Sequence, residues 1–147
     1  MGIDPVKNWE RPGLEIGAGS GYNAAVLGEL VKEVYTIEII EQLADWSKEA
    51  LKKTGYDNVY VKHADGYYGW EGKMFDAIII TAAANHVTQP LVNQLKMNGK
   101  LIMPLASQAG FQALTLITKT PEGLETKMIT GVRFVPMTGR AQQWLFK

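Results

Sequence analysis

Three glycines and the residues around them form the part of the chain with the clearest chemical pattern. Gly17, Gly19 and Gly21 follow a short apolar stretch that ends at Ile16, and a helical pattern comes after them. Glycine at a strand-to-helix turn allows positive φ and removes Cβ atoms that would keep a ligand from the backbone. The first turn of the next helix offers unpaired N–H groups to a polar or anionic group. The loop therefore predicts a ligand-binding turn.

The position of the third glycine separates two kinds of nucleotide site. A dinucleotide-binding fingerprint, Gly-x-Gly-x-x-Gly, would place that glycine where Tyr22 stands. This chain instead has Gly-x-Gly-x-Gly, ending at Gly21 and preceded by Glu15. That spacing favours a nucleoside ligand without a pyrophosphate to cradle, and it disfavours NAD.

Two acidic residues follow predicted strands at the same sheet edge as the glycine loop. Glu38 ends a stretch that begins at Val34, and a carboxylate there can accept both hydroxyls of a ribose. Asp65 and Gly66 end the next strand, where aspartate can accept the exocyclic amine of adenine and glycine leaves room for the ring. The alternatives are a solvated acid for Glu38 and an ordinary Asp-Gly turn. Three signals on one edge favour the nucleoside site.

The segment after the apolar stretch from Phe75 limits the chemistry. Residues Thr81 to Ala84 are small, whereas enzymes that methylate amino groups of nucleic-acid bases carry an Asn/Asp-Pro-Pro-aromatic segment here. Base methylation is therefore not predicted, and without Cys no thiolate can attack a pyrimidine ring. His86 is a candidate general base, although a surface histidine is the favoured interpretation, and the case for His63 is weaker. The pattern assigns no catalytic residue.

The aromatic run from Tyr67 to Trp70 has two interpretations. It can line an adenine pocket, or it can fill the core where a crossover helix is missing, and the second is favoured for Trp70. The two histidines of the chain have no neighbouring acidic triad, so no metal site is predicted.

Apolar periodicity predicts the elements that must position these residues. Helical stripes and short apolar runs alternate along the first two thirds of the chain, which indicates parallel strands joined by helices. The run 75–83 is apolar apart from Asp76 and Thr81 and is predicted to be a central strand buried on both faces. After Phe111 the pattern changes to a wide antiparallel hairpin around Pro121–Gly123. The predicted strands are 13–16, 34–38, 59–61, 75–83, 101–105 behind a turn at 97–100, and the hairpin arms 113–118 and 126–134; the predicted helices lie near 26–31, 40–51 and 91–95.

Length and composition set the class of protein. The chain has 147 residues, 46% of them hydrophobic, which fits one domain over residues 1–147. Its net charge of zero argues against a large nucleic-acid-binding surface. No apolar stretch is long enough for a membrane span, and residues 1–10 contain no secretory signal. The absence of Cys is compatible with a reducing, cytoplasmic location.

Taken together, these residues resemble the protein-L-isoaspartate O-methyltransferase family of S-adenosylmethionine-dependent repair enzymes. The likeness runs from Gly13 to Gly139, and its most specific parts are Thr81–Ala84 and the ending Val132–Pro136. The other matching stretches are 14–25, 34–38, 65–67, 75–80, 90–96, 99–101 and 137–139.

The resemblance implies a three-layer α/β Rossmann-like methyltransferase fold, with a mostly parallel seven-stranded sheet and a C-terminal antiparallel hairpin. It implies S-adenosyl-L-methionine as cofactor, S-adenosyl-L-homocysteine as product, and isoaspartyl peptides or proteins as substrates. Glu38 would bind the ribose, and Asp65 with Gly66 would contact the adenine. The full set of implied cofactor-binding residues is Glu15, Gly17, Gly19, Gly21, Tyr22, Glu38, Ile39, Asp65, Gly66, Thr81 and Ala82.

The chain departs from the family at its start. Only residues 1–12 precede the first predicted strand, and they do not match the family's longer N-terminal region, which holds the substrate and covers the cofactor. Without that region one face of the sheet would expose apolar area, so homo-oligomerisation is a hypothesis. Two alternative functions therefore stay open: a catalytically impaired relative that only binds cofactor, and a methyltransferase for another small carboxylate or hydroxyl.

Overall fold

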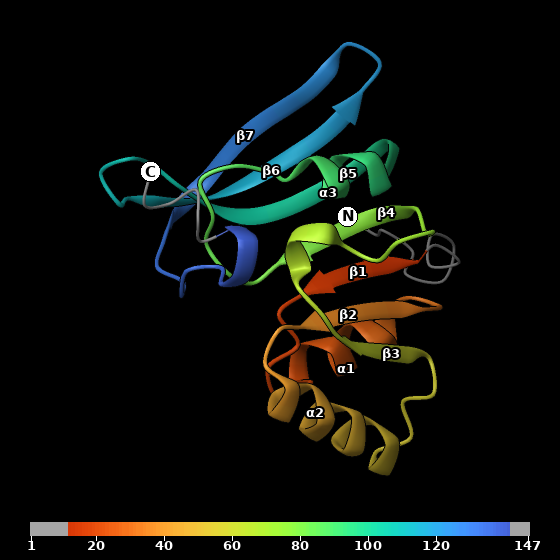
Figure 1. Cartoon of the computed structure of the whole chain (residues 1–147). Helices are drawn as coiled ribbons and strands as arrows, with labels where there is room; N and C mark the ends of the chain where they lie inside the picture. Colours follow the sequence, from red (N-terminus) through yellow and green to blue (C-terminus); the bar gives the residue numbers. More distant parts are fainter. Residues whose placement is uncertain (1–11, 142–147) are drawn as a thin grey trace.

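The computed structural model describes residues 12–141, whose strands form one seven-stranded sheet in the order β3-β2-β1-β4-β5-β6-β7 (Figure 1). The first five strands along the chain run parallel, and β6 and β7 are antiparallel to their neighbours. This arrangement confirms the predicted fold class. The strands are β1 (Gly13–Ile16), β2 (Val34–Glu38), β3 (Val59–His63), β4 (Phe75–Ile80), β5 (Leu95–Ala106), β6 (Gln112–Thr120) and β7 (Gly123–Val132).

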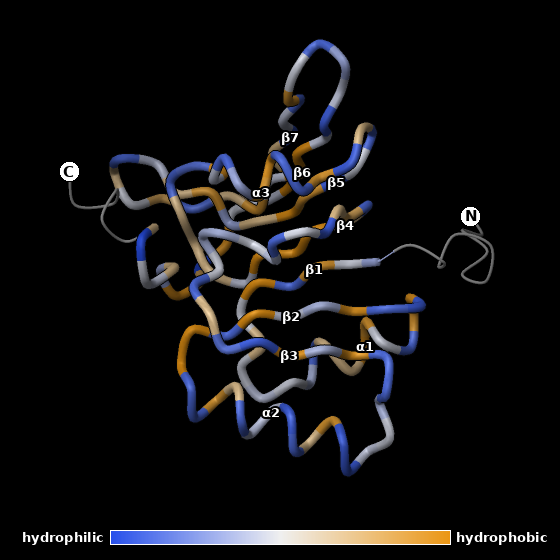
Figure 2. Tube along the Cα trace, turned by 45° about the vertical axis from the view of Figure 1, so that its right-hand side comes forward, coloured by the Kyte–Doolittle hydropathy of each residue, from blue (hydrophilic) through white to orange (hydrophobic). Residues whose placement is uncertain are grey.

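Helices lie on both faces of the sheet. On one face, α1 (Tyr22–Leu30) and α2 (Glu41–Lys53) cover β2 and β3. On the other face lie α3 (Gln89–Gln94) and the 3-10 turn η1 (Gly66–Tyr68), and a second such turn, η2 (Gly139–Ala141), contacts η1. Hydrophobic residues recur along α2 about once per helical turn, with hydrophilic residues between them, so that the helix is amphipathic (Figure 2). The result is three layers.

The largest apolar cluster lies on the α3 face. Successive strands place apolar side chains opposite one another in register, as Ile16 pairs with both Ile37 and Ile80. Leu91 of α3 is fully buried against this layer. The strand residues of the cluster are Leu14, Ile16, Tyr35, Ile37, Phe75, Ile78, Ile80, Leu95, Leu101, Met103 and Ile117.

The opposite face of β4–β6 is more open. Ala77 is exposed there, and Ile79, Ile102 and Leu116 lie in register across the three strands and are only half-buried. Among the described residues, the main helix contacts on this face fall on β2 and β3. The prediction that β4 is buried on both faces is therefore wrong, because α1 and α2 do not extend over it.

Several element boundaries also differ from the predictions, and three of the differences have a structural cause or consequence. β4 ends at Ile80 rather than residue 83, because Ala83 and Ala84 leave the sheet ladder to bridge to Pro136 and Leu105. β5 starts at Leu95, so the turn predicted at 97–100 lies within this strand. There the pairing with β4 shifts register, and Asn98 has a φ of 65°. The hairpin is tight: Thr120 pairs with Gly123 across a two-residue loop.

Candidate functional site

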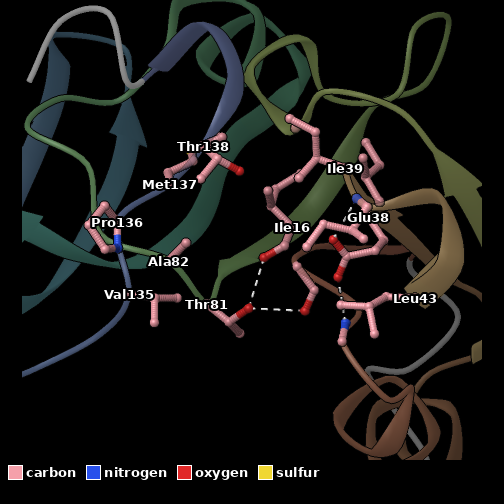
Figure 3. Close-up of a pocket in the computed structure, with 15 residues that line it drawn as sticks. Ile16, Glu38, Ile39, Leu43, Thr81, Ala82, Val135, Pro136, Met137 and Thr138 are labelled. Atoms are coloured by element: carbon pink, nitrogen blue, oxygen red, sulfur yellow. Dashed lines mark hydrogen bonds between the residues drawn. The ribbon is translucent and has the colours of Figure 1, made fainter.

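A cavity of about 540 Å³ opens at the carboxyl ends of β1, β2 and β4 (Figure 3). Parallel α/β sheets bind ligands at this edge, where the strand order reverses between β1 and β4. One wall comes from the glycine loop and the residues after β2, and the other from Thr81, Ala82 and the segment 135–138. Of the predicted site residues, the lining contains Gly17, Gly19, Glu38, Ile39, Gly66, Thr81 and Ala82.

Glu38 is the acidic residue of the cavity wall and is 6% exposed. Its Oε1 accepts a hydrogen bond from the Gly19 N–H at 2.8 Å, and its Oε2 accepts one from the Ile40 N–H at 3.1 Å (Figure 3). The carboxylate therefore joins the glycine loop to the start of α2. Each oxygen has a further lone pair, so the group can also accept ligand hydroxyls.

The glycine loop is held at both of its sides. The Gly17 N–H donates to the Ile37 carbonyl at 2.8 Å, and the Thr81 hydroxyl is 3.0 Å from the carbonyl oxygens of Ile16 and Gly17. A Cβ on Gly17 would collide with the Thr81 hydroxyl, and φ there is 104°. At Gly19, with a φ of 54°, an added Cβ would meet no atom within 4 Å. Because this space is open, a ligand in the cavity can approach the Gly19 backbone closely.

Gly21 and Tyr22 do not reach the cavity. An added Cβ on Gly21 would lie 3.1 Å from the Cβ of Ser47, so this glycine allows α1 and α2 to pack closely rather than a nucleoside to approach. Tyr22 is 77% exposed. Their predicted contact with a ligand stays a prediction.

Glu15 lies beneath the glycine loop and is fully buried on the α1 face of the sheet. Its carboxylate accepts hydrogen bonds from the Thr36 hydroxyl and the Asn23 side-chain amide, both at 2.6 Å. Burial raises the pKa of this carboxyl above its ordinary value of 4.5, and the two hydrogen bonds partly oppose that rise. The side chain is outside the cavity lining and ties β1, β2 and α1 together.

Asp65 and Gly66 lie at the far end of the cavity, but only Gly66 lines it. A Cβ on Gly66 would overlap the Ile16 side chain and lie 3.3 Å from Met137. The Asp65 carboxylate accepts the N–H groups of Tyr67 at 2.9 Å and Arg140 at 2.8 Å. Each carboxylate oxygen thus already accepts a hydrogen bond from a backbone N–H. The predicted contact of Asp65 with adenine stays a prediction.

Sequence reasoning predicted Thr81 and Ala82 of the second wall but missed its other part, which we call the C-terminal strap (Phe134–Thr138). The Ala83 N–H donates to the Val135 carbonyl at 2.8 Å, and the Met137 N–H donates to the Ala83 carbonyl at 2.7 Å. The side chain of Gln112 bonds both the N–H and the carbonyl of Phe134, at 2.7 and 3.0 Å. The strap residues belong to the segment that carries the family resemblance, which was the available signal for them.

The remaining candidates of the sequence lie elsewhere. Trp70 packs edge-to-face on Tyr35 with ring centroids 5.0 Å apart, which confirms its interpretation as a core residue. His63 contacts the Ile39 carbonyl at 3.1 Å, His86 contacts Asn85, and neither histidine lines the cavity. Within residues 12–141 no group of His, Asp and Glu could hold a metal ion. No helix in the described part of the chain is long and apolar enough to cross a membrane.

Comparisons with known proteins agree with this architecture. Residues 8–142 match the family model of protein-L-isoaspartate(D-aspartate) O-methyltransferase. A protein-L-isoaspartate O-methyltransferase from Nitrosospira multiformis is 53% identical over 128 residues, which cover 86% of this chain and 54% of that protein. A relative of the same name from Gloeobacter violaceus is 47% identical over 88% of this chain and 64% of its own length.

Solved structures give the same result. A protein-L-isoaspartate O-methyltransferase superposes with a TM-score of 0.86 at 30% identity, over 90% of this chain and 44% of that one. A Plasmodium falciparum protein assigned the same enzyme name, solved in complex with S-adenosyl-L-homocysteine, has a TM-score of 0.77 at 27% identity over 87% of this chain and 66% of its own.

The chain spans just over half the length of the first of the curated relatives that it matches. The matched region nevertheless includes the glycine loop, Glu38, Asp65 and the C-terminal strap, since the family model extends from residue 8 to residue 142. The chain therefore belongs to the protein-L-isoaspartate(D-aspartate) O-methyltransferase family.

Proposed function

We propose that this chain binds S-adenosyl-L-methionine and transfers its methyl group to the carboxylate of L-isoaspartyl residues in damaged proteins. The observation that carries the proposal is the buried Glu38 carboxylate beside bare glycine backbone, at the reversal point of the sheet. The relative from Plasmodium falciparum holds the demethylated cofactor, which supports the same ligand class here.

The residues of the cavity fit such a cofactor. The volume of about 540 Å³ lies within the range of small-molecule sites, roughly 300–1,000 Å³. Glu38 would accept the ribose hydroxyls, and Gly19 leaves the backbone open to the ligand. The apolar side chains of Ile39 and Met137 line the end near Gly66, where a purine ring needs contact surface. We propose the predicted residue set as the cofactor site, with Glu15, Gly21, Tyr22 and Asp65 acting from outside the lining.

The reaction requires little acid–base chemistry from the protein. The bound cofactor supplies an electrophilic methyl group on a sulfonium. An isoaspartyl carboxylate is ionised at neutral pH, so its oxygen forms the new O–CH₃ bond without a general base while the S–CH₃ bond breaks and leaves a neutral thioether. The task of the chain is to align the two groups and to exclude water. The backbone nitrogen that follows can then attack the ester and expel methanol to close a succinimide, which water reopens partly to aspartate.

A second candidate function is cofactor binding without methyl transfer. It is favoured by the cavity itself, whose described lining offers a cofactor contact through Glu38 and assigns no residue to an acceptor. A third, methylation of another small carboxylate or hydroxyl, uses the same cofactor site with a different acceptor.

The deciding experiment combines two measurements on the 147-residue chain. Calorimetry with S-adenosyl-L-homocysteine measures cofactor binding, and transfer of labelled methyl to an isoaspartyl peptide measures activity, with the matched aspartyl peptide as control. Binding with transfer to the isoaspartyl peptide alone supports the proposal. Binding without transfer supports the second candidate, transfer only to other acceptors supports the third, and no binding by the folded chain contradicts all three.

The remaining attributes are part of the same proposal. We propose a single methyltransferase domain for residues 1–147, isoaspartyl proteins as partners rather than nucleic acid or membranes, and a cytoplasmic location. The support is the one sheet that contains all described strands, together with the zero net charge and the Cys-free composition.

A further inference from the structure

The last strand of the sheet presents an unusually free edge. Among the strands of residues 12–141, β7 has one neighbour, β6, and nine of its ten residues are exposed. Figure 1 shows the hairpin of β6 and β7 extending beyond α3 at the outside of the molecule. Open strand edges pair with further strands unless bulges, proline or unmatched charges prevent it. The register shift in β7 falls at Ile129, so the edge is regular from Gly123 to Met128, and its two charges there, Glu125 and Lys127, are opposite in sign.

The tight loop determines which backbone groups point outward. Thr120 and Gly123 close a two-residue turn, so they form a hydrogen-bonded pair. Such pairs alternate with non-bonded pairs along an antiparallel ladder. The register Ile117↔Thr126 is therefore a non-bonded pair, as are the registers of Leu124 and Met128. These three residues direct their N–H and C=O groups away from β6.

The side chains at this edge are self-complementary. In an antiparallel pair of two β7 strands related by a two-fold axis at Thr126, Thr126 lies opposite its own copy and Leu124 lies opposite Met128. All three carry outward backbone groups, so the hydrogen-bonded positions coincide. Glu125 then lies opposite Lys127 of the other copy, at a non-bonded position where side chains are closest. Opposite-charge and Thr–Thr pairs both stabilise such contacts.

We propose that two copies of this chain associate through antiparallel pairing of their β7 edges, centred on Thr126. The charges Glu125 and Lys127 select this register. Centring the axis on Leu124 would leave Glu125 opposite Gly123, and centring it on Met128 would bring Lys127 opposite Ile129, where the ladder of β7 is irregular; both shifts lose the two charge pairs. The contact is short, so it forms a reversible, concentration-dependent dimer. The contact is also separate from the cavity, none of whose lining residues lies in β7.

The test is sedimentation velocity over a concentration series on the full chain and a charge-swap set of variants. The wild type is expected to shift from monomer to dimer with concentration. Glu125→Lys alone and Lys127→Glu alone each place like charges opposite one another and should give monomers, and the double variant should restore the dimer. Lys53→Glu makes the same change of charge as Lys127→Glu at an exposed position of α2. It is the matched control and should dimerise like the wild type.

A second variant addresses the backbone. Thr126→Pro removes an outward N–H while leaving the β6 ladder intact, so it should abolish the dimer with an unchanged circular dichroism spectrum. A chain that is monomeric at all concentrations overturns the proposal. A dimer that survives Glu125→Lys and Thr126→Pro also overturns it, and places the contact elsewhere, for example on the open face of β4–β6. Failure of the double variant to restore the dimer overturns the register.

Discussion

The two walls of the cavity are built in different ways. The first wall carries the polar groups of the cavity, namely the glycine-loop backbone and Glu38, which are joined directly by the bond from Gly19 to Glu38 beside the apolar residues that follow β2. The second wall, the C-terminal strap, contributes mostly apolar side chains and is held by backbone bonds to Ala83. The first wall thus carries the groups that recognise a ligand, and the second encloses the space in which they act.

The largest effect is expected at the buried residue of the strap. Met137 is 4% exposed and packs against the core beside Gly66. Met137→Ala should lower the free energy of unfolding by about 2–5 kcal/mol, because it leaves a cavity in the core. Urea denaturation measures this loss.

Val135→Ala is the matched control from the same strap, since Val135 is 72% exposed. It should change the free energy of unfolding by less than about 0.5 kcal/mol. Equal effects of the two variants would show that the strap does not pack as described.

The next effect concerns the polar wall and rests on the proposed function. Glu38→Gln keeps the size of the side chain but removes its charge, so ligand hydroxyls lose charged hydrogen bonds worth about 1.5–3 kcal/mol. The affinity for S-adenosyl-L-homocysteine should fall roughly 10- to 100-fold in calorimetry.

The neighbouring Glu41→Gln is the control, because Glu41 is exposed in the first turn of α2. Its affinity for the same ligand should equal that of the wild type. If Glu38→Gln also binds normally, the ribose assignment of Glu38 is wrong.

The same contrast explains what could be predicted from the sequence. The polar wall is local: Gly17, Gly19 and Glu38 sit at the ends of two consecutive strands, and their spacing alone indicates a shared edge. The core position of Trp70 was also predicted correctly. No helical pattern follows β3, so an aromatic side chain was expected to fill the space that a crossover helix would occupy. Local patterns identify residues whose neighbours are close along the chain.

The second wall depends on contacts that no local pattern reports. The bridge from Ala83 to Pro136 and the bonds from Gln112 to Phe134 join segments far apart in sequence. The same limit hid the packing contacts of Glu15 and Gly21, whose partners Thr36 and Ser47 lie on other elements, while their predicted ligand contacts stay predictions. Predicting β4 as buried on both faces failed similarly, because apolar composition does not reveal where helices end over the sheet.

Two glycines of the cavity differ in what lies beside them: open space at Gly19 and packed side chains at Gly66. Gly66→Ala would overlap Ile16 and approach Met137, so it should lower the free energy of unfolding by about 1–3 kcal/mol. Gly19→Ala meets open space and costs only the left-handed backbone strain of about 1 kcal/mol. Thermal denaturation of both variants compares these costs.

Ligand binding should separate the two variants further. The Cβ of Gly19→Ala enters the space beside the cavity backbone, so this variant should lose more affinity for S-adenosyl-L-homocysteine than its small loss of stability suggests. A Gly19→Ala protein with wild-type affinity would show that the ligand does not approach this backbone.

The smallest effect is expected beneath the polar wall, at Glu15. Burial raises the pKa of this carboxyl, so the folded state holds its proton to higher pH than the unfolded chain does. Its contribution to stability is therefore full below the ordinary pKa of 4.5 and is lost as pH rises through the folded-state pKa. Glu15→Gln cannot titrate, so the advantage of the wild type over this variant should shrink with rising pH, by at most about 1.4 kcal/mol per pH unit.

Urea denaturation of both proteins at a series of pH values measures this slope. Asn23→Ala supplies the companion test, because the Asn23 hydrogen bond lowers the pKa of Glu15. Its removal should raise that pKa further and extend the loss of stability to higher pH. If the difference in free energy of unfolding between wild type and Glu15→Gln stays constant with pH, Glu15 has the same pKa in the folded and unfolded states. Its buried hydrogen bonds to Thr36 and Asn23 would then fully compensate the cost of burying its charge.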